Sequence, residues 1–235
     1  MSGHSKWSTI RHKKAANDAV KGSVFTKMAK GITIAVKKGG GVGDPNMNFA
    51  LRLAVDKARS VNMPRENIDR AIDKGLGKGG VELAELTIEG FAPDGVAVVL
   101  DVVSDSRNRV VAEIRTLMEK YGGRMGEPGS VMHGFERCGI IHAKAASIAE
   151  DWQLEMIDLG MSDVVSDDTG STIYTSPESL HNVIKYLQSK GVEVDGALGY
   201  RPKTLVEVED STKVEQFLDI ISSYEDVQEV YANLG

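Results

Sequence analysis

The sequence contains little cysteine and few aromatic residues. Cys138 is the one cysteine among 235 residues, so no disulfide can form within the chain, and we expect an inert, half-buried thiol. Aromatic residues make up 6% of the chain, whereas the apolar share of 41% is ordinary for a protein with a packed core. A chain of this length corresponds to one large domain or to two or three smaller ones.

Membrane and secretion signals are missing as well. The sequence has no run of eighteen apolar residues, so we expect no membrane-spanning helix. The first residues contain no apolar stretch of the kind found in secretory signal peptides. They are basic and contain serine, as transit peptides do, but they continue into a structured pattern without a cleavage-like break. We therefore expect a cytoplasmic protein with no membrane partner.

Metal-ligand and catalytic motifs are absent from the sequence. The five histidines show no ligand spacing with one another or with the cysteine; they are His4, His12, His133, His142 and His181. Asp101 and Asp105 lie near the end of a predicted strand and Glu113 on the next helix, so a metal-dependent nuclease is an alternative. Solvated strand-end acids are the simpler interpretation. The sequence thus predicts no catalytic residue, no metal site and no cofactor.

Charge is distributed unevenly along the chain. The whole sequence has a net charge of −6, but residues 1–38 contain nine Lys and Arg and one acid, Asp18. Residues 1–78 contain sixteen Lys and Arg against six Asp and Glu, a net charge of +10. Residues 79–235 contain twelve against twenty-eight, a net charge of −16. The basic part is typical of a polyanion-binding surface, and the acidic part indicates a different partner.

The first 22 residues have weak apolar periodicity and predict an exposed arm that is partly helical around residues 8–20. Cationic side chains alternate there with one aromatic residue, and Lys and Arg can neutralise phosphates. The indole of Trp7 can stack on an unpaired base or anchor the arm to the body of the protein. The candidate nucleic-acid contacts in this segment are His4, Lys6, Trp7, Arg11, His12, Lys13, Lys14 and Lys21.

A lysine-rich amphipathic helix is predicted after the arm. Ser23 can cap its start and Gly39 its end. Val24, Phe25, Met28, Ile32, Ala35 and Val36 fall on one side of a helical wheel. The other side, which we name the lysine ridge, carries Lys27, Lys30, Lys37 and Lys38, with no acid nearby in the sequence. The glycines that follow at 39–43 resemble a phosphate loop only weakly, because no strand precedes them and no Gly-Lys-Ser/Thr follows.

Two further helices complete a predicted three-helix bundle over residues 1–78. The first covers residues 46–61, with Phe49, Leu53 and Ala54 on its core side, and the second opens with Pro64 at its first position. We find no clear helix-turn-helix; the nearest groove-reading candidates on the last helix are Arg65, Asn67 and Arg70.

Beyond residue 78 the pattern alternates between strands and helices and predicts an α+β protein. Residues 134–200 follow the β-α-β-β-α-β order of a ferredoxin-like domain. The segments before and after it complete a second four-stranded unit, which we expect to be another ferredoxin-like α/β sandwich, so the third domain is inserted in the second. The expected domains are residues 1–78, residues 79–133 plus 201–235, and residues 134–200. The expected elements of the interrupted unit are strands 86–91, 96–103, 204–208 and 227–231 and helices 107–121 and 213–223.

Several ordered motifs resemble those of a known family. They are GHSKWSTIRHKKA at residues 3–15, FTK at 25–27, NMPRENIDRAI at 62–72, EGFAPDGVA at 89–97, DSRNR at 105–109 and GSV at 129–131. The chain resembles the YebC/PmpR family, which includes the mitochondrial translational activator of cytochrome oxidase subunit I. Ser106 replaces the Asn usual before Arg-Asn-Arg, and the glycine loop is somewhat expanded.

The resemblance implies three domains and a non-enzymatic role in gene expression. Bacterial members are described as DNA-binding transcriptional regulators, and the family also as ribosome-associated translation factors that relieve stalling. We therefore expect a nucleic-acid-binding regulator whose partner is duplex DNA or ribosomal RNA, with ribosomal proteins as further partners of the acidic domains. Arg107, Asn108 and Arg109 are a second candidate contact, because they lie at a helix start whose backbone amides face anions.

Overall fold

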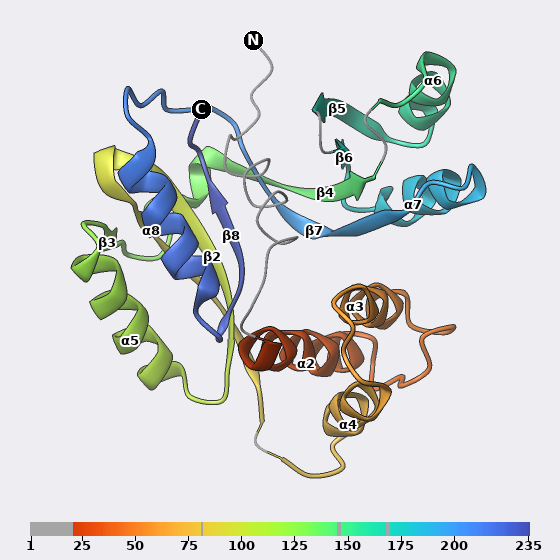
Figure 1. Cartoon of the computed structure of the whole chain (residues 1–235), viewed down its shortest axis with the longest axis horizontal. Coiled ribbons are helices and arrows are strands. Elements are labelled where there is room, and N and C mark those ends of the chain that lie inside the picture. Colours follow the sequence, from red (N-terminus) through yellow and green to blue (C-terminus); the bar gives the residue numbers. More distant parts are fainter. Residues whose placement is uncertain (1–20, 81, 145–146, 168–169) are drawn as a thin grey trace.

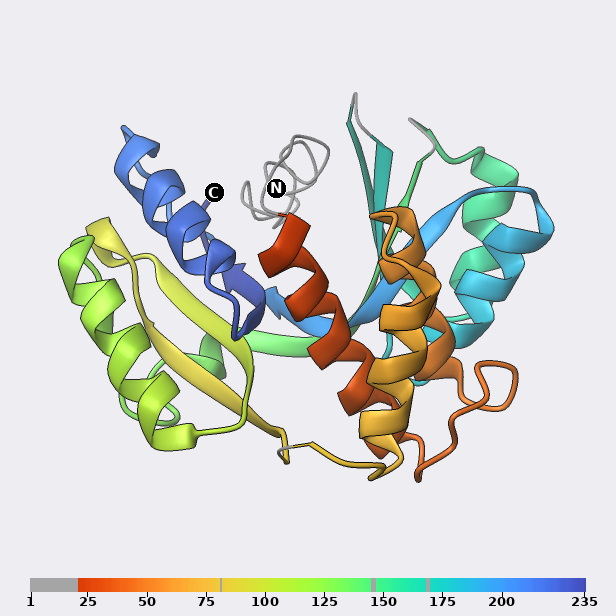
Figure 2. The same ribbon diagram turned by 60° about the horizontal axis from the view of Figure 1, so that its bottom comes forward.

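The computed structural model describes residues 21–80, 82–144, 147–167 and 170–235, and it has an α+β architecture. A helical unit contains α2 (Lys21–Lys38), α3 (Phe49–Ser60) and α4 (Arg65–Gly75). Two four-stranded antiparallel sheets with their own helices follow. Figures 1 and 2 show the helical unit beside both sheets, with α2 nearer to the first sheet and α3 nearer to the second.

The helical unit is held together by the apolar faces of its three helices. Its core contains Ile32 and Val36 of α2, Leu51 and Val55 of α3, and Ile68 of α4, all of them buried. This pattern follows the helical periodicity of the sequence.

The predicted cap of α2 was wrong at the start of the helix and correct at its end. The helix already contains Lys21, so Ser23 lies inside the helix and the prediction that it caps the start was wrong. At the other end, Gly40 adopts a φ of 70°, and the amide of Gly41 donates to the carbonyl of Val36 at 3.0 Å. Glycine tolerates this left-handed conformation, so the glycine run ends the helix as expected.

The buried side chain of Asn48 joins the end of α2 to the start of α3. Its Oδ1 accepts a hydrogen bond from the amide of Leu51 at 3.1 Å, which caps α3. Its Nδ2 donates to the carbonyls of Ala35 and Val42, each at 3.0 Å. One amide side chain therefore satisfies polar backbone groups at both helix ends, which fixes the angle between the two helices.

Helix α3 has two apolar faces rather than the single core side that the sequence predicted. Ala54 packs in the helical core together with Leu51 and Val55, whereas Phe49 and Leu53 pack against the core of the second sheet. The Phe49 ring meets the His181 ring edge to face, with 4.0 Å between ring centroids. The helix thus connects two cores, and the prediction of one core side was wrong.

Sheet 1 has the strand order β3-β1-β2-β8. Its strands are β1 (Ala84–Phe91), β2 (Ala97–Ser104), the short β3 (Arg124–Met125) and β8 (Val227–Ala232). Helices α5 (Arg107–Lys120) and α8 (Thr212–Ser223) share one apolar core with the sheet and cover the same face (Figure 1). The fourth strand is β3, not the predicted segment 204–208, which forms a single bridge between Val206 and Leu234.

Sheet 2 lies between β3 and β8 in the chain and has the order β5-β6-β4-β7. Its elements are β4 (Phe135–Ala143), α6 (Glu150–Asp158), β5 (Met161–Asp167), β6 (Gly170–Thr175), α7 (Leu180–Ser189) and β7 (Val194–Pro202). This is the spatial order of the ferredoxin-like fold. The proposed domain boundaries stay a prediction.

The uncovered face of sheet 1 packs onto the start of β4. Val99, Val131, Phe135 and Tyr231 form a buried cluster there, and the Tyr231 ring contacts the Tyr200 ring edge to face at 5.4 Å. The two sheets therefore share a small apolar junction, which β4 and β7 span (Figure 2).

Glu89 organises the loop that leads from sheet 1 to sheet 2. Its carboxylate accepts hydrogen bonds from the amides of Gly129, Val131 and Met132 at 2.6, 2.8 and 2.8 Å. Burial alone raises the pKa of this carboxyl, but the three amide bonds outweigh it and lower the pKa. One charged side chain of β1 thus holds this segment in place.

Cys138 on β4 is fully buried, not half-buried as predicted. Burial raises the pKa of its thiol to about 11, so the thiol stays protonated at neutral pH.

Among the helices of the described segments, none combines the length and the apolar character of a membrane span.

We predict that Asn48→Ala lowers the free energy of unfolding by about 2–4 kcal/mol, because it removes a helix cap and two hydrogen bonds to the carbonyls of Ala35 and Val42. Chemical denaturation measures the change. Asn46→Ala is the matched control, since Asn46 is an exposed residue of the same loop. Equal stability of the two variants would contradict the role given to Asn48.

Candidate nucleic-acid interface

The candidate contacts of the N-terminal arm lie outside the described residues. This applies to His4, Lys6, Trp7, Arg11, His12, Lys13 and Lys14, which stay predictions. Lys21 is the first described residue of α2. The geometry of the interface is therefore built from the lysine ridge and from the cations of the other helices.

The C-terminal half of the lysine ridge contacts the beginning of sheet 1. Nζ of Lys38 lies 2.7 Å from the Glu85 carboxylate on β1. Nζ of Lys37 donates to the carbonyl of Leu83 at 3.2 Å and lies 3.6 Å from the Glu82 carboxylate. Glu82 and Glu85 thus balance the charge of these two lysines. The sequence close to the helix did not reveal these partners.

The N-terminal half of the ridge contacts the turn between α8 and β8. Nζ of Lys27 donates to the carbonyl of Ser222 at 3.3 Å, and Lys30 forms an ion pair with Asp226. All four ridge lysines therefore face the acidic sheet 1 unit. The expectation that no acid balances the ridge was wrong, because its partners lie far away in the sequence.

Asp226 is the centre of a buried polar network. Its side chain is fully buried, and it accepts hydrogen bonds from Lys30, from Nη2 of Arg109 at 3.1 Å and from Oγ of Ser104 at 3.1 Å. Its backbone carbonyl accepts the amide of Val103 at 2.8 Å. A buried carboxylate is stable only when it is paired in this way, so the network fixes α2, α5 and β2 around one charge.

Arg109 has a structural role in the same network. Besides Asp226, its guanidinium contacts the carboxylates of Asp105 at 3.0 Å and Glu113 at 2.9 Å. Three acids surround this one cation, and the hydrogen bond from Arg109 holds the pKa of Asp105 below its usual value. Asp105 and Glu113, two of the three carboxylates considered for a metal, are thus bound to an arginine.

Arg107 and Asn108 are exposed at the N-terminal end of α5, where the sequence predicted a second phosphate contact. Unlike Arg109, neither side chain enters an ion pair within the described segments. The three residues of this motif therefore differ in role. The side chains of Arg107 and Asn108 face solvent, whereas Arg109 belongs to the polar network around Asp226.

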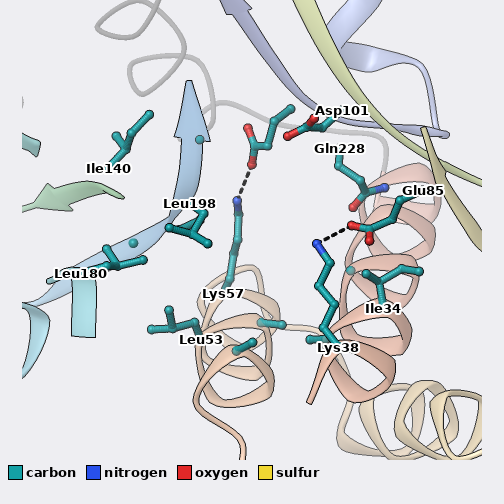
Figure 3. A pocket seen from close by; sticks show the side chains of 18 of the residues that line it. Ile34, Lys38, Leu53, Lys57, Glu85, Asp101, Ile140, Leu180, Leu198 and Gln228 are labelled. Carbon is teal, nitrogen blue, oxygen red and sulfur yellow. Dashed lines mark hydrogen bonds and ion pairs between the residues drawn. The ribbon is translucent and has the colours of Figure 1, made fainter. Parts of the chain in front are cut away.

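A cleft of about 610 Å³ lies between the helical unit and the two sheets (Figure 3). Its walls are apolar where Ile34, Leu53 and Leu180 face it, and charged along the side of sheet 1. Lys57 of α3 reaches across and pairs with Glu229 of β8 at 2.9 Å. Nothing in the sequence near Lys57 indicated this acid, which lies 172 positions away.

Asp101 of β2 lies in this cleft and carries a perturbed carboxyl group. Burial raises its pKa to about 6, the neighbouring charge of Glu229 adds to the rise, and Lys38 opposes it. Asp101 is thus a partly buried strand residue, not the solvated strand-end acid that the sequence suggested.

The glycine loop has no free amides for a phosphate over its first four residues. The amides of Gly39, Gly40, Gly41 and Val42 donate to the carbonyls of Ala35, Lys37, Val36 and Gly39. These bonds close the end of α2, so the loop acts as a helix end.

Two histidines with described side chains, His142 and His181, have structural surroundings. Nδ1 of His142 lies 3.1 Å from Oγ1 of Thr172 on the neighbouring strand. His181 packs on Phe49, and burial lowers its pKa. Across the described segments, no three His, Cys, Asp or Glu side chains are grouped so that they could hold a metal ion.

Helix α4 carries two cations that differ from those of the ridge. Arg70 bonds to the carbonyl of Glu66 and to the side chain of Asn67, and within the described segments neither Arg70 nor Lys74 forms an ion pair. Lys74 was not among the predicted contacts, although it lies one helical turn beyond Arg70. Among the described residues, Arg70 and Lys74 are therefore cations that remain available for a ligand on the side of the helical unit formed by α2 and α4.

We predict that Asp226→Asn lowers the free energy of unfolding by about 3 kcal/mol, because Lys30 and Arg109 lose their shared buried counter-charge. Equilibrium denaturation measures the loss. Glu225→Gln is the matched control, since it removes one charge from the neighbouring, exposed position. A similar effect of both variants would mean that net charge, not the network, sets the stability.

We predict that Asp101→Asn stabilises the protein at pH 7.5 and has little effect at pH 4. The folded-state pKa is raised, so protonation favours the folded state, and stability is lost as pH rises through about 6. The gain at high pH is at most about 3 kcal/mol. Denaturation at both pH values measures it, and an equal effect at the two values would contradict the shifted pKa.

Comparison with known proteins extends over nearly the whole chain. A family model described as the TACO1/YebC protein N-terminal domain matches residues 5–78, and a model described as the TACO1/YebC second and third domain matches residues 83–234. A conserved hypothetical protein of Aquifex aeolicus, known from a crystal structure, superposes with a TM-score of 0.84 and 37% identity. The match covers 93% of this chain and 91% of that one.

Relatives similar along their full length carry a common name. A protein of Chloroflexus aurantiacus (strain ATCC 29366 / DSM 635 / J-10-fl), named a probable transcriptional regulatory protein, is 45% identical over 241 residues, covering 100% of this chain and 95% of the relative. A similarly named protein of Chlorobaculum tepidum is 44% identical over 240 residues, with the same coverage. The motifs that resembled the YebC/PmpR family thus lie within two matching family models, and the chain belongs to the TACO1/YebC family.

Proposed function

We propose that this protein is a non-enzymatic, nucleic-acid-binding regulator of gene expression. It binds either duplex DNA as a transcriptional regulator or ribosomal RNA as a translation factor that relieves ribosome stalling. The names of its relatives support a regulatory role. Its location in the cytoplasm is part of the same proposal.

The separation of charge carries the proposal. The basic residues gather in the first 78 positions and the acidic residues in the two sheet units. Part of the basic charge is used inside the molecule, where ridge lysines and Lys57 pair with acids of sheet 1. Within the described part of the chain, Arg70, Lys74 and Arg107 form no ion pair and are available for phosphates, and the arm cations are further predicted contacts. The ridge contributes to binding only where its lysines leave their partners.

The charge pattern of α4 argues against insertion of this helix into the major groove of duplex DNA. Its exposed side carries Glu66, Asp69 and Asp73, and the last two are paired with Arg65 and Lys78 at 3.6 and 2.8 Å. Carboxylates on a recognition helix oppose the phosphates that flank the groove. The acidic sheet units have the charge that suits basic ribosomal proteins.

We predict that Lys13→Gln/Lys14→Gln lowers the affinity for nucleic acid about tenfold at 100 mM salt, because two phosphate contacts and their released counterions are lost. Anisotropy titrations with duplex DNA and a ribosomal RNA fragment, and ribosome cosedimentation across a salt series, measure it. Lys120→Gln/Lys213→Gln is the charge-matched control on exposed lysines of the sheet 1 unit.

The salt series also separates the two targets. Ribosome association that outlasts duplex binding as salt rises supports the translation role. Sequence-selective duplex binding with no ribosome peak supports transcription. Absence of binding to either target, or equal losses in the two double variants, would contradict the proposal.

A further inference from the structure

A groove of about 290 Å³ runs between α2 and α4, on the side of the helical unit away from the large cleft. Its apolar lining comes from Phe25 and Ala29 of α2, from Met63, and from Ala71 of α4. Its polar lining consists of Thr26, Asn67, Arg70 and Lys74. The site therefore combines an apolar floor with polar and cationic side chains, as a binding site for a polar, planar ligand requires.

The polar residues of α4 form one row along the groove. Asn67, Arg70 and Lys74 are three and four positions apart, so they lie on the same side of the helix. The Arg70 guanidinium is held in place by its bonds to the Glu66 carbonyl, at 3.2 Å, and to Oδ1 of Asn67. Because Asn67 uses its oxygen in this bond, its NH₂ group remains as a donor.

The charge in the groove is not compensated by lining acids. None of the residues that line it is an Asp or Glu, and over the described ranges Arg70 and Lys74 make no ion pair. The neighbouring cations Arg65 and Lys78 differ, since each pairs with an acid of α4. The groove thus attracts an anion more strongly than the rest of the helix does.

We propose that this groove binds one unpaired nucleotide of an RNA strand. The base contacts Phe25 and Met63, and the phosphates on either side of it contact Arg70 and Lys74. Aromatic and thioether side chains pack against the face of any base, and the Asn67 amide can donate to an acceptor on the base edge. A base inside a duplex reaches the groove only after unstacking, so looped or bulged RNA is preferred.

The inference rests on the proposed nucleic-acid-binding function and adds the class of ligand. The test uses the full-length protein and two RNA stems, one with a single bulged nucleotide and one fully paired. We expect the protein to bind the bulged stem about tenfold more tightly, which corresponds to a stacking gain of roughly 1–3 kcal/mol for one base.

The decisive variant is Arg70→Gln/Lys74→Gln. It should weaken binding of the bulged stem about tenfold and lower the salt dependence by the equivalent of about two phosphate contacts. Arg65→Gln/Lys78→Gln removes the same charge from paired cations nearby and should cost less than about threefold. Phe25→Leu, which keeps an apolar side chain, should abolish the preference for the bulged stem while thermal unfolding confirms that the variant is folded.

Two results would overturn the groove site. Equal losses in the two double variants would mean that only net charge matters, and equal affinity of the wild-type protein for both stems would exclude an unpaired nucleotide. If RNA binding still depends on Lys13 and Lys14 in either case, the groove fails while the proposed function stands.

Discussion

The buried ion pair between Lys30 and Asp226 is the contact on which the arrangement of the molecule depends. Asp226 is fully enclosed, and it accepts bonds from α2, from α5 and from the end of β2. A buried carboxylate is costly unless it is paired, so separating the helical unit from sheet 1 would remove the Lys30 ammonium and leave Asp226 with Arg109 and Ser104 alone. Lys57 and Lys38 add two further contacts between the same units. Electrostatic pairing therefore holds the basic and acidic parts of the chain together.

This pairing changes the meaning of the charge distribution. A surplus of lysine in the first 78 residues indicates a polyanion partner, but part of that surplus neutralises acids of the chain itself. Whether a lysine is available for a polyanion therefore depends on its partner in the folded chain, not on its position on a helical wheel. Arg109 illustrates the same point, because it follows two exposed residues at a helix start yet is surrounded by three carboxylates. Arg70 and Lys74, which form no ion pair within the described segments, lie beside the groove that we propose for a base.

Local patterns in the sequence predicted most elements, and long-range contacts explain what they missed. The periodicity of Val110, Ile114 and Met118 correctly gave α5, and the order of elements gave the inserted ferredoxin-like unit. The short strand β3 was missed because two residues carry no alternating pattern, and segment 204–208 was assigned in its place. The acids that face the ridge were missed because Asp226 is 196 positions from Lys30. A local sequence pattern gives no information about contacts between residues so far apart in the chain.

The most direct test of this account is a lysine-reactivity footprint of the full-length protein, with and without bound RNA, read by mass spectrometry after mild acylation. The account predicts that Lys30 reacts slowly in both samples, because its ammonium is bound to a buried carboxylate. It predicts that Lys74 reacts readily in the free protein and becomes protected when RNA binds. Fast reaction of Lys30 in the free protein, or protection of the ridge lysines by RNA without protection of Lys74, would contradict it.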